Sequence, residues 1–201
     1  EMRLPRLSRN CCGSFSLMPV AISRLSIPGA FLAEPAYFRD ERGWFFESWR
    51  ERDYAAAGVS EPFLQDNVSC SAANVLRGLH YQASDAQGQM VTIVSGRIFD
   101  VIVDLRRSSP TFGKHESVVL EDTSPRQLYM PAGVAHGFCV MSEVAILNYK
   151  CTKYHNTATE RGVRWNDPDL AIRWPSVEPV LSPRDRAYPL LREMSHRDLP
   201  E

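Results

Sequence analysis

Two short stretches of the chain carry the residues best suited to proton chemistry. The first, residues 77–82, places His80 close to an arginine, a tyrosine and an amide. The second, residues 131–138, is a proline- and glycine-containing turn that leads His136 into an apolar run. Because the imidazole pKa lies near neutrality, either histidine could serve as an acid, a base or a metal ligand. A lone histidine is more often an ordinary surface or core residue, so the neighbours decide the interpretation.

The polar side chains of the first stretch cannot all share one face of a regular strand. Side chains alternate with period two, so Arg77, His80 and Gln82 cannot all point the same way. We expect some of them to lie on a bend at a strand end, where Gly78 permits unusual backbone angles. Together with the polar residues 65–67, these side chains form the densest cluster of polar residues in the sequence. The rim of a β-barrel is where such a group would form a site.

The elements that must position these residues are predicted to be strands. Short β-branched or aromatic runs bounded by Gly, Pro and Ser lie at residues 89–94, 97–105, 115–120, 127–130, 137–140 and 144–149. Many short strands in a chain of this length favour a sandwich or barrel of the jelly-roll kind. Helical signal is confined to the flanks: residues 47–57, stopped at Gly58, and one or two short helices in an irregular tail after Pro175.

Composition indicates one globular domain. The 201 residues are 44% hydrophobic and 23% charged, and no linker, repeat or low-complexity tract divides them. We expect residues 18–201 to form a single domain and residues 1–17 to be an N-terminal extension, disordered or artificial. The formal net charge of −1 gives no basic field for nucleic acid or an anionic membrane, which argues against both partners.

The cysteines and the hydropathy pattern predict a cytoplasmic protein. Five cysteines, an odd number without C-x-x-C spacing, indicate reduced thiols. The apolar runs are shorter than the roughly 20 residues of a membrane span. Among the basic residues, only Lys114, Lys150 and Lys153 are lysines. The guanidinium group of arginine can bind a phosphate or a carboxylate with two hydrogen bonds. Few residues, in contrast, could serve as a catalytic lysine.

In combination, the motifs resemble those of the dTDP-4-dehydrorhamnose 3,5-epimerase family. The resemblance runs in order, without large gaps, from about Ile22 to Leu191. It is carried by Asp40-Glu41-Arg42-Gly43, Phe45-Phe46-Glu47, Gln65-Asp66-Asn67, residues 77–82, Phe99-Asp100-Val101, residues 109–113, Gln127-Leu128, residues 131–138, Trp165-Asn166-Asp167 and residues 181–185.

This resemblance implies an all-β, cupin-like jelly roll, a double-stranded β-helix with short flanking helices, that forms a homodimer and uses no metal or organic cofactor. It also implies an isomerase with a dTDP-linked substrate, dTDP-4-dehydro-6-deoxy-D-glucose, inverted at C-3 and C-5 on the route to dTDP-L-rhamnose. Both carbons adjoin the C-4 ketone, so their protons are acidic enough for a positioned base to remove. The resulting enolate is then reprotonated from the opposite face.

The roles of individual residues are carried over from the family position by position. His80 matches the base, Asp185 the carboxylate that holds its tautomer, and Tyr149 the acid on the other face. The other matched positions bind substrate: Arg42 and Arg77 at the diphosphate, Glu47, Gln65 and Asn67 at the nucleotide and sugar, and His136 and Tyr154 near the sugar.

One departure from the family pattern concerns the carbonyl oxygen of the substrate. Gln89 stands where the family typically has a lysine whose ammonium stabilises the developing oxyanion. An amide still donates a hydrogen bond, but a charge-assisted bond is roughly twice as strong. Gln89 therefore points to a slower enzyme, a single-carbon epimerase or another 4-keto sugar nucleotide, unless Lys150 or Lys153 supplies the charge.

Three alternatives to the two-carbon epimerase stay open. The first is an epimerase acting at C-3 only, on a modified deoxysugar. The second is a nucleotide-sugar-binding cupin that has lost catalysis, although binding alone needs no acid and base. The third is a metal cupin that uses His80 and His136, against which the residues after His80 contain no second histidine or nearby glutamate.

Overall fold

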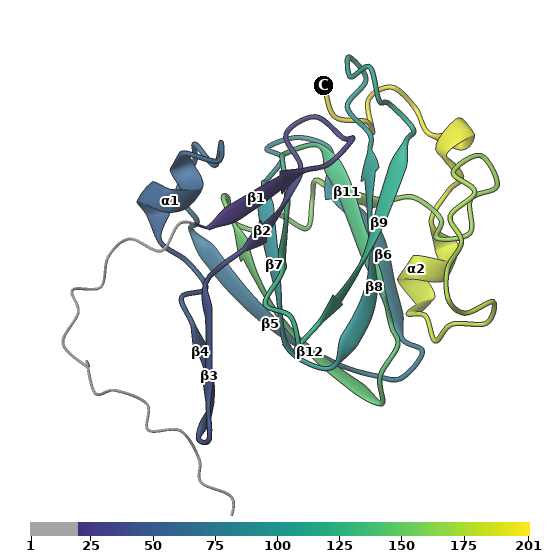
Figure 1. Cartoon of the computed structure of the whole chain (residues 1–201). Helices are drawn as coiled ribbons and strands as arrows, with labels where there is room; N and C mark the ends of the chain where they lie inside the picture. Colours follow the sequence, from purple (N-terminus) through teal and green to yellow (C-terminus); the bar gives the residue numbers. More distant parts are fainter. Residues whose placement is uncertain (1–19) are drawn as a thin grey trace, which may run out of the picture.

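Two antiparallel sheets lie face to face and enclose the main apolar core (Figure 1). The computed structural model describes residues 20–201, so the predicted extension, residues 1–17, lies outside the described residues. The larger sheet has the strand order β1-β2-β10-β7-β12-β5, and the smaller has the order β13-β6-β11-β8-β9. A separate two-stranded hairpin, β3-β4, extends away from the sandwich. The predicted all-β jelly roll with short flanking helices is confirmed.

The bounds of the elements are as follows. The larger sheet consists of β1 (Ala21–Arg24), β2 (Phe31–Glu34), β5 (Gln65–Ala72), β7 (Gln89–Ser95), β10 (Gln127–Met130) and β12 (Val144–Cys151). The smaller consists of β6 (Leu76–Gln82), β8 (Arg97–Asp104), β9 (His115–Glu121), β11 (Val134–Val140) and β13 (Glu160–Gly162). The remaining elements are β3 (Tyr37–Asp40), β4 (Gly43–Phe46), α1 (Glu51–Ala55), α2 (Pro183–Ala187) and the 3-10 helix η1 (Leu191–Glu193).

Alternation along the strands places one set of apolar side chains between the sheets. Ile98 and Ile102 of β8 face Val91 and Ile93 of β7 in a fully or almost fully buried core. The opposite faces of both sheets are also covered. Tyr54 of α1 seals the outside of the larger sheet, and the C-terminal tail covers the outside of the smaller one. The sandwich therefore has a rigid frame on both sides of its interior.

The first helix is shorter than predicted. Residues 47–50 form neither helix nor strand, and α1 covers only Glu51–Ala55 before a turn ends at Gly58. Trp49 packs against the rings of Tyr54 and Phe63, with ring centroids 4.6 Å apart in both pairs. This packing anchors the segment before the helix against the residues that follow it. The tail after Pro175 matches the prediction, because α2 and η1 are both short.

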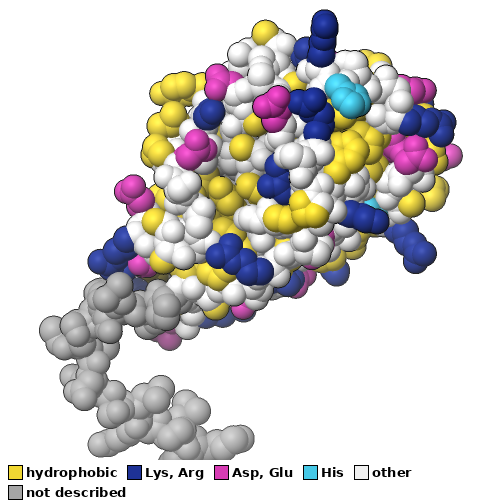
Figure 2. All heavy atoms as spheres, turned by 90° about the horizontal axis from the view of Figure 1, so that it is seen from above, with side chains coloured by type: hydrophobic (Ala, Val, Ile, Leu, Met, Phe, Trp, Pro, Cys, Tyr) yellow, Lys and Arg dark blue, Asp and Glu magenta, His cyan; other side chains and the backbone are white. Residues whose placement is uncertain are grey.

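Charges of both signs share the surface. Figure 2 shows Lys and Arg side chains interspersed with Asp and Glu on one face of the molecule, rather than gathered into a field of one sign. Within residues 20–201, no helix is long and apolar enough to cross a membrane.

Candidate active site

One end of the sandwich interior changes from apolar to polar side chains. On β12, the inward-facing Ala145 and Leu147 belong to the main core, and the next inward position is Tyr149. On β7, Val91 lies in the core and Gln89 in the polar region. Because both strands keep their alternation, the change of residue type creates a cavity without breaking either sheet.

The resulting pocket has a volume of about 380 Å³ and gathers most of the predicted site residues. Those that line it are Gln65, Asn67, Arg77, His80, Gln89, His136 and Tyr149. They come from strands of both sheets, so the pocket lies between the two layers. A cavity of this size, with convergent polar groups, is typical of a small-molecule site.

The backbone around Gly78 explains how Arg77 and His80 reach the same pocket. Gly78 has a φ of +112°, and a Cβ at this position would lie 2.6 Å from the Cα of Gly137 on β11. The register between β6 and β11 also shifts between His136 and Phe138. This irregularity breaks the strict alternation. The predicted bend therefore exists, but it lies inside β6 rather than at its end.

His80 is paired with the carboxylate that the sequence assigns to it. Its Nε2 lies 2.6 Å from Oδ1 of Asp185, whose side chain is only 4% exposed. Ser182 caps α2 by accepting from the amide of Asp185, and its hydroxyl donates to Oδ2 of the same residue. Burial alone would raise the pKa of Asp185. The hydrogen bonds from His80 and Ser182 outweigh this effect, so the pKa lies below the usual value. An ionised Asp185 keeps a proton on Nε2 and leaves Nδ1 of His80 as the basic nitrogen.

Tyr149 enters the pocket from the opposite sheet. It lies on β12 of the larger sheet, whereas His80 lies on β6 of the smaller one. Burial raises the pKa of the Tyr149 phenol above its ordinary value. The phenol therefore stays protonated at neutral pH and can give up a proton to a strong base such as an enolate.

His136 has a carboxylate partner of its own, which sequence reasoning did not assign. Its Nε2 lies 2.8 Å from Oδ1 of Asp100 on β8, and the Asp100 side chain is completely buried. Burial raises the pKa of Asp100, and the adjacent His136 offsets this only in part. Two of the histidines that line the pocket, His80 and His136, are thus each paired with a buried carboxylate.

The predicted binding residues around this centre are held by further hydrogen bonds. Arg77 donates from Nε to Ser71 over 3.0 Å, which leaves the outer nitrogens of its guanidinium available. Gln65 donates to Asn67 over 2.9 Å and accepts from the backbone N–H of His155, also over 2.9 Å. These contacts fix the loop after β12 against the edge strand β5.

Neither candidate lysine compensates for Gln89. Lys150 points to the outside of the larger sheet, where its Nζ lies 2.9 Å from Asp66. Lys153 pairs with Asp85 over 3.1 Å. Neither lysine lines the pocket. The positively charged residues that line the pocket are Arg77 and Arg184.

Four predicted residues do not line the pocket of their own chain. Asp185 contacts it through His80, whereas the other three lie apart from it. Arg42 occupies the β3–β4 turn, where it pairs with Asp40 over 2.5 Å. It lies away from the pocket because the hairpin projects away from both sheets (Figure 1). Glu47 follows the hairpin and pairs with Arg50. Tyr154 lies in the loop after β12 and is 69% exposed. Their substrate-binding roles stay predictions.

Several lining residues were missed by sequence reasoning, and two of them form an ion pair at the pocket. Arg184 contacts both carboxylate oxygens of Glu160, at 2.6 and 3.1 Å, and Nε2 of His155 lies 3.3 Å from the same group. Arg184 directly precedes Asp185 in the C-terminal motif, and that position was the available signal. Glu160 lies in no motif that would single it out.

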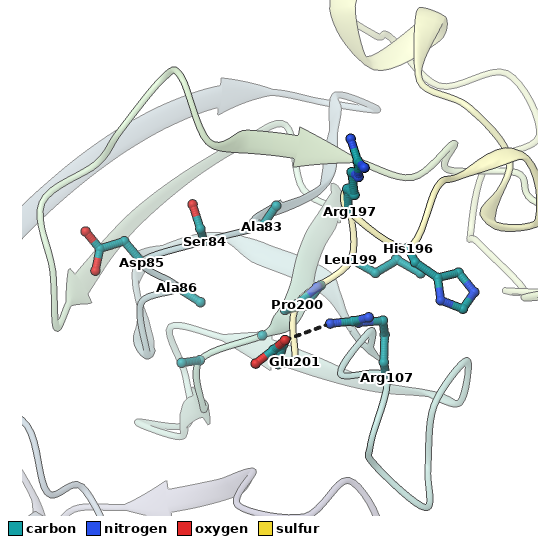
Figure 3. A pocket seen from close by; sticks show the side chains of 12 residues that line it. Ala83, Ser84, Asp85, Ala86, Arg107, His196, Arg197, Leu199, Pro200 and Glu201 are labelled. Carbon is teal, nitrogen blue, oxygen red and sulfur yellow. Dashed lines mark hydrogen bonds and ion pairs between the residues drawn. The ribbon is translucent and has the colours of Figure 1, made fainter.

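A second depression lies beside the C-terminus and contains none of the predicted residues (Figure 3). Its walls are residues 83–86 and the tail, and Arg107 crosses it to bind Glu201 over 3.0 Å. Within residues 20–201, no group of three or more His, Cys, Asp or Glu side chains is arranged to hold a metal ion. The pocket between the sheets is therefore the candidate active site.

Comparison with known proteins gives concordant matches. A profile of the dTDP-4-dehydrorhamnose 3,5-epimerase family matches residues 24–193. The dTDP-4-dehydrorhamnose 3,5-epimerase of Pseudomonas aeruginosa is 50% identical over 166 residues, which cover 82% of this chain and 92% of that protein. The dTDP-6-deoxy-D-glucose-3,5-epimerase of Legionella pneumophila, solved with dTDP-4-keto-L-rhamnose, superposes with a TM-score of 0.88 at 42% identity, covering 90% of this chain and 98% of that one. ChmJ, a 3'-monoepimerase of Streptomyces bikiniensis solved with dTDP-quinovose, gives a TM-score of 0.81 at 36% identity over 88% and 91% of the two chains.

A jelly roll in which an imidazole–carboxylate pair and a partly buried phenol meet at one pocket fits an isomerase of the cupin type, which moves protons on a sugar. The chain belongs to the dTDP-4-dehydrorhamnose 3,5-epimerase family.

Proposed function

We propose that this protein epimerises a dTDP-linked 4-keto-6-deoxy sugar, dTDP-4-dehydro-6-deoxy-D-glucose, at C-3 and C-5. The observation that carries the proposal is the placement of His80 and Tyr149 on opposite sheets of one pocket. Nδ1 of His80 takes the proton from the carbon beside the C-4 ketone, and the electron pair moves into an enolate. Tyr149 then returns a proton to the other face, so the carbon is inverted with no net change in composition.

An epimerase that inverts C-3 only is the second candidate, and Gln89 favours it. The pocket offers an amide where a cation would stabilise the enolate oxygen more strongly. ChmJ, the 3'-monoepimerase, is a structural relative of this chain. A weaker oxyanion site slows proton removal beside the ketone, so the slower of the two epimerisations would be the first to be lost.

Proton exchange in deuterated water tests both candidates. We expect label from solvent to enter C-3 and C-5 of dTDP-4-dehydro-6-deoxy-D-glucose in step with formation of the epimer. Label at C-3 alone would select the single-carbon reaction. If no label entered any dTDP-linked 4-keto sugar, the epimerase proposal would be wrong, and a binding protein would replace it.

A homodimer in which the hairpin of one protomer reaches the pocket of its partner would give Arg42 and Glu47 their predicted roles. The exposed aromatic side chains of the hairpin support this arrangement. Phe38, Trp44 and Phe45 are 43%, 45% and 58% exposed on a two-stranded sheet that pairs with no other strand among the described residues. Such a ribbon is marginally stable in water by itself. We also infer a cytoplasmic location, which the free thiols of Cys70, Cys139 and Cys151 support.

A further inference from the structure

Asp100 is a carboxyl group in the apolar core that the proton transfers above do not use. It lies on β8 between the buried, inward-facing Ile98 and Ile102, and its own side chain is 0% exposed. Oδ1 contacts His136, whereas Oδ2 has no hydrogen-bond partner among residues 20–201. An isolated ionised carboxylate in such a place is costly, so the pair must carry a proton that compensates for it.

The possible proton positions then restrict the tautomer of His136. If Asp100 is protonated, it donates to Nε2, and the ring proton lies on Nδ1. If Asp100 is ionised and His136 is an imidazolium, both ring nitrogens carry protons. Only an ionised Asp100 beside a neutral ring leaves Nδ1 bare. Burial disfavours that state, because the hydrogen bonds from His136 and the backbone of Val101 only partly offset it, and Oδ2 has no partner among residues 20–201. In both favoured states, Nδ1 carries a proton.

The surroundings of Asp185 produce the opposite arrangement at His80. Asp185 receives hydrogen bonds from the hydroxyl of Ser182 as well as from His80, and the guanidinium of Arg184 lies nearby. These groups stabilise an ionised carboxylate next to a neutral imidazole. His80 and His136 are partners in the register of β6 and β11, and they are therefore protonated differently. Nδ1 of His80 has a free lone pair, whereas Nδ1 of His136 carries a proton.

We propose that the Nδ1–H of His136 donates to the carbonyl oxygen at C-4 of the sugar, and that Asp100 is the positioning residue that keeps this proton in place. The inference rests on the proposed epimerase reaction. Nε2 of His136 is occupied by Asp100, so Nδ1 is the ring nitrogen left for a ligand of the pocket that His136 lines. Gln89 and the absence of a lysine from the lining leave the enolate oxygen in need of such a donor.

Nitrogen NMR of the resting protein tests the proton position without any substrate. The five histidines are labelled with ¹⁵N, and the signals of His136 are assigned by their loss in His136→Asn. We expect Nδ1 of His136 to show the shift of a protonated nitrogen at neutral pH, and Nδ1 of His80 that of a bare one. An unprotonated Nδ1 on His136 would overturn the inference. Because no turnover is measured, failure of the epimerase proposal cannot produce that result.

A double-mutant cycle tests the catalytic consequence. Leucine is chosen because Asp100 lies among aliphatic side chains. Removing one partner of a buried pair is destabilising, so circular dichroism and a urea titration establish first that Asp100→Leu is folded. We expect it to lower kcat about a hundredfold, the usual cost of one oxyanion donor. The affinity for dTDP should stay within about threefold, since the donor acts on the sugar.

The same substitution is then made in His136→Asn, whose side-chain amide offers an N–H that does not depend on Asp100. There we expect Asp100→Leu to change kcat by less than about threefold. An equal loss in both backgrounds would mark Asp100 as merely structural, and an unchanged kcat in the single variant would also overturn the inference. If Asp100→Leu failed to fold, the NMR measurement on the unaltered protein would decide.

Discussion

His80 and His136 are register partners across the β6–β11 ladder, and each turns its Nε2 toward a different carboxylate. Asp185 reaches His80 from the C-terminal helix α2, whereas Asp100 reaches His136 from the neighbouring strand β8. The first carboxylate is stabilised by polar neighbours and the second is enclosed by aliphatic side chains. One pocket can therefore hold a base and a donor of the same residue type.

Replacing His80 by alanine should abolish turnover and leave nucleotide binding intact. Loss of the base removes a general-base contribution of about 10²–10⁴ in rate. The affinity for dTDP, measured by calorimetry, should stay within about threefold. His115→Ala on β9 is the matched control, because His115 lies outside the pocket and should not affect either quantity. Turnover that survived in His80→Ala would show that another group is the base.

Replacing Tyr149 by phenylalanine should separate exchange from inversion. His80 can still remove the proton and return it to the same face, so label from deuterated water should continue to enter the substrate. Epimer formation should fall by at least about a hundredfold, because the acid on the other sheet is gone. The two rates are measured in one NMR time course, which makes each the control for the other. Equal losses of exchange and inversion would contradict the assignment of Tyr149 as the acid.

Most strands of the two sheets could be predicted because β-branched and aromatic residues, which fit a half-buried sheet, are concentrated in them. β-branched and aromatic runs located β7, β8, β9, β10 and β12 to within one or two residues at most ends, and β11 begins three residues earlier than predicted. The edge strand β5 was not predicted as a strand. Its inward positions include Gln65, Asn67 and Ser69, which line a polar pocket instead of an apolar core. Because these positions line a polar pocket, β5 lacks the alternation of apolar and polar residues by which a strand is predicted.

The site was predictable only where family motifs supplied the partners. His80 and Asp185 are 105 residues apart in sequence, and no local pattern links them. Asp100 belonged to a recognised motif, but its contact with His136 depends on the pairing of β8 with β11. Arg42 and Glu47 lie outside their own chain's pocket, so their predicted roles depend on a second copy that one sequence cannot position.

Replacing Gln89 by lysine should raise kcat by about tenfold, because an ammonium would add a charge-assisted bond to the enolate oxygen. The effect should be seen in kcat more than in KM, since the charge develops only during reaction. Lys150→Gln is the matched control. Its partner Asp66 lies outside the pocket, so that exchange of charge for amide should leave kcat unchanged. An unaltered kcat in Gln89→Lys would mean that the amide position does not face the carbonyl oxygen.

Introducing a charge on the hairpin should dissociate the proposed dimer. Phe45→Glu places a carboxylate among aromatic side chains that are expected to be covered by the partner protomer. Light scattering after gel filtration should show a monomer, with turnover reduced because Arg42 no longer reaches the other pocket. Phe112→Glu, on an exposed loop remote from the hairpin, is the control and should remain dimeric. A dimer that persisted in Phe45→Glu would place the interface elsewhere.

Asp104 should carry much of the acid sensitivity of folding. Its side chain is fully buried at the end of β8; burial raises its pKa, but bonds from Arg106, Ser109 and Thr111 outweigh this and lower it to about 2. Because the pKa is lower in the folded state than its ordinary 3.8, the stabilisation is present above pH 3.8 and is lost as the pH falls through about 2. The difference corresponds to about 2 kcal/mol of unfolding free energy.

We therefore expect Asp104→Asn to unfold more easily at neutral pH by about that amount or more, since the donor groups of three residues lose their charged acceptor. Between about pH 5 and pH 2, its stability should fall less steeply than that of the unaltered protein. Urea titrations across this range measure both effects. Asp169→Asn is the control, because its side chain is 52% exposed and its one ion-pair contact within residues 20–201, to Arg192, is 3.9 Å long. Parallel acid profiles for Asp104→Asn and the unaltered protein would show that the loop held by Asp104 does not depend on its charge.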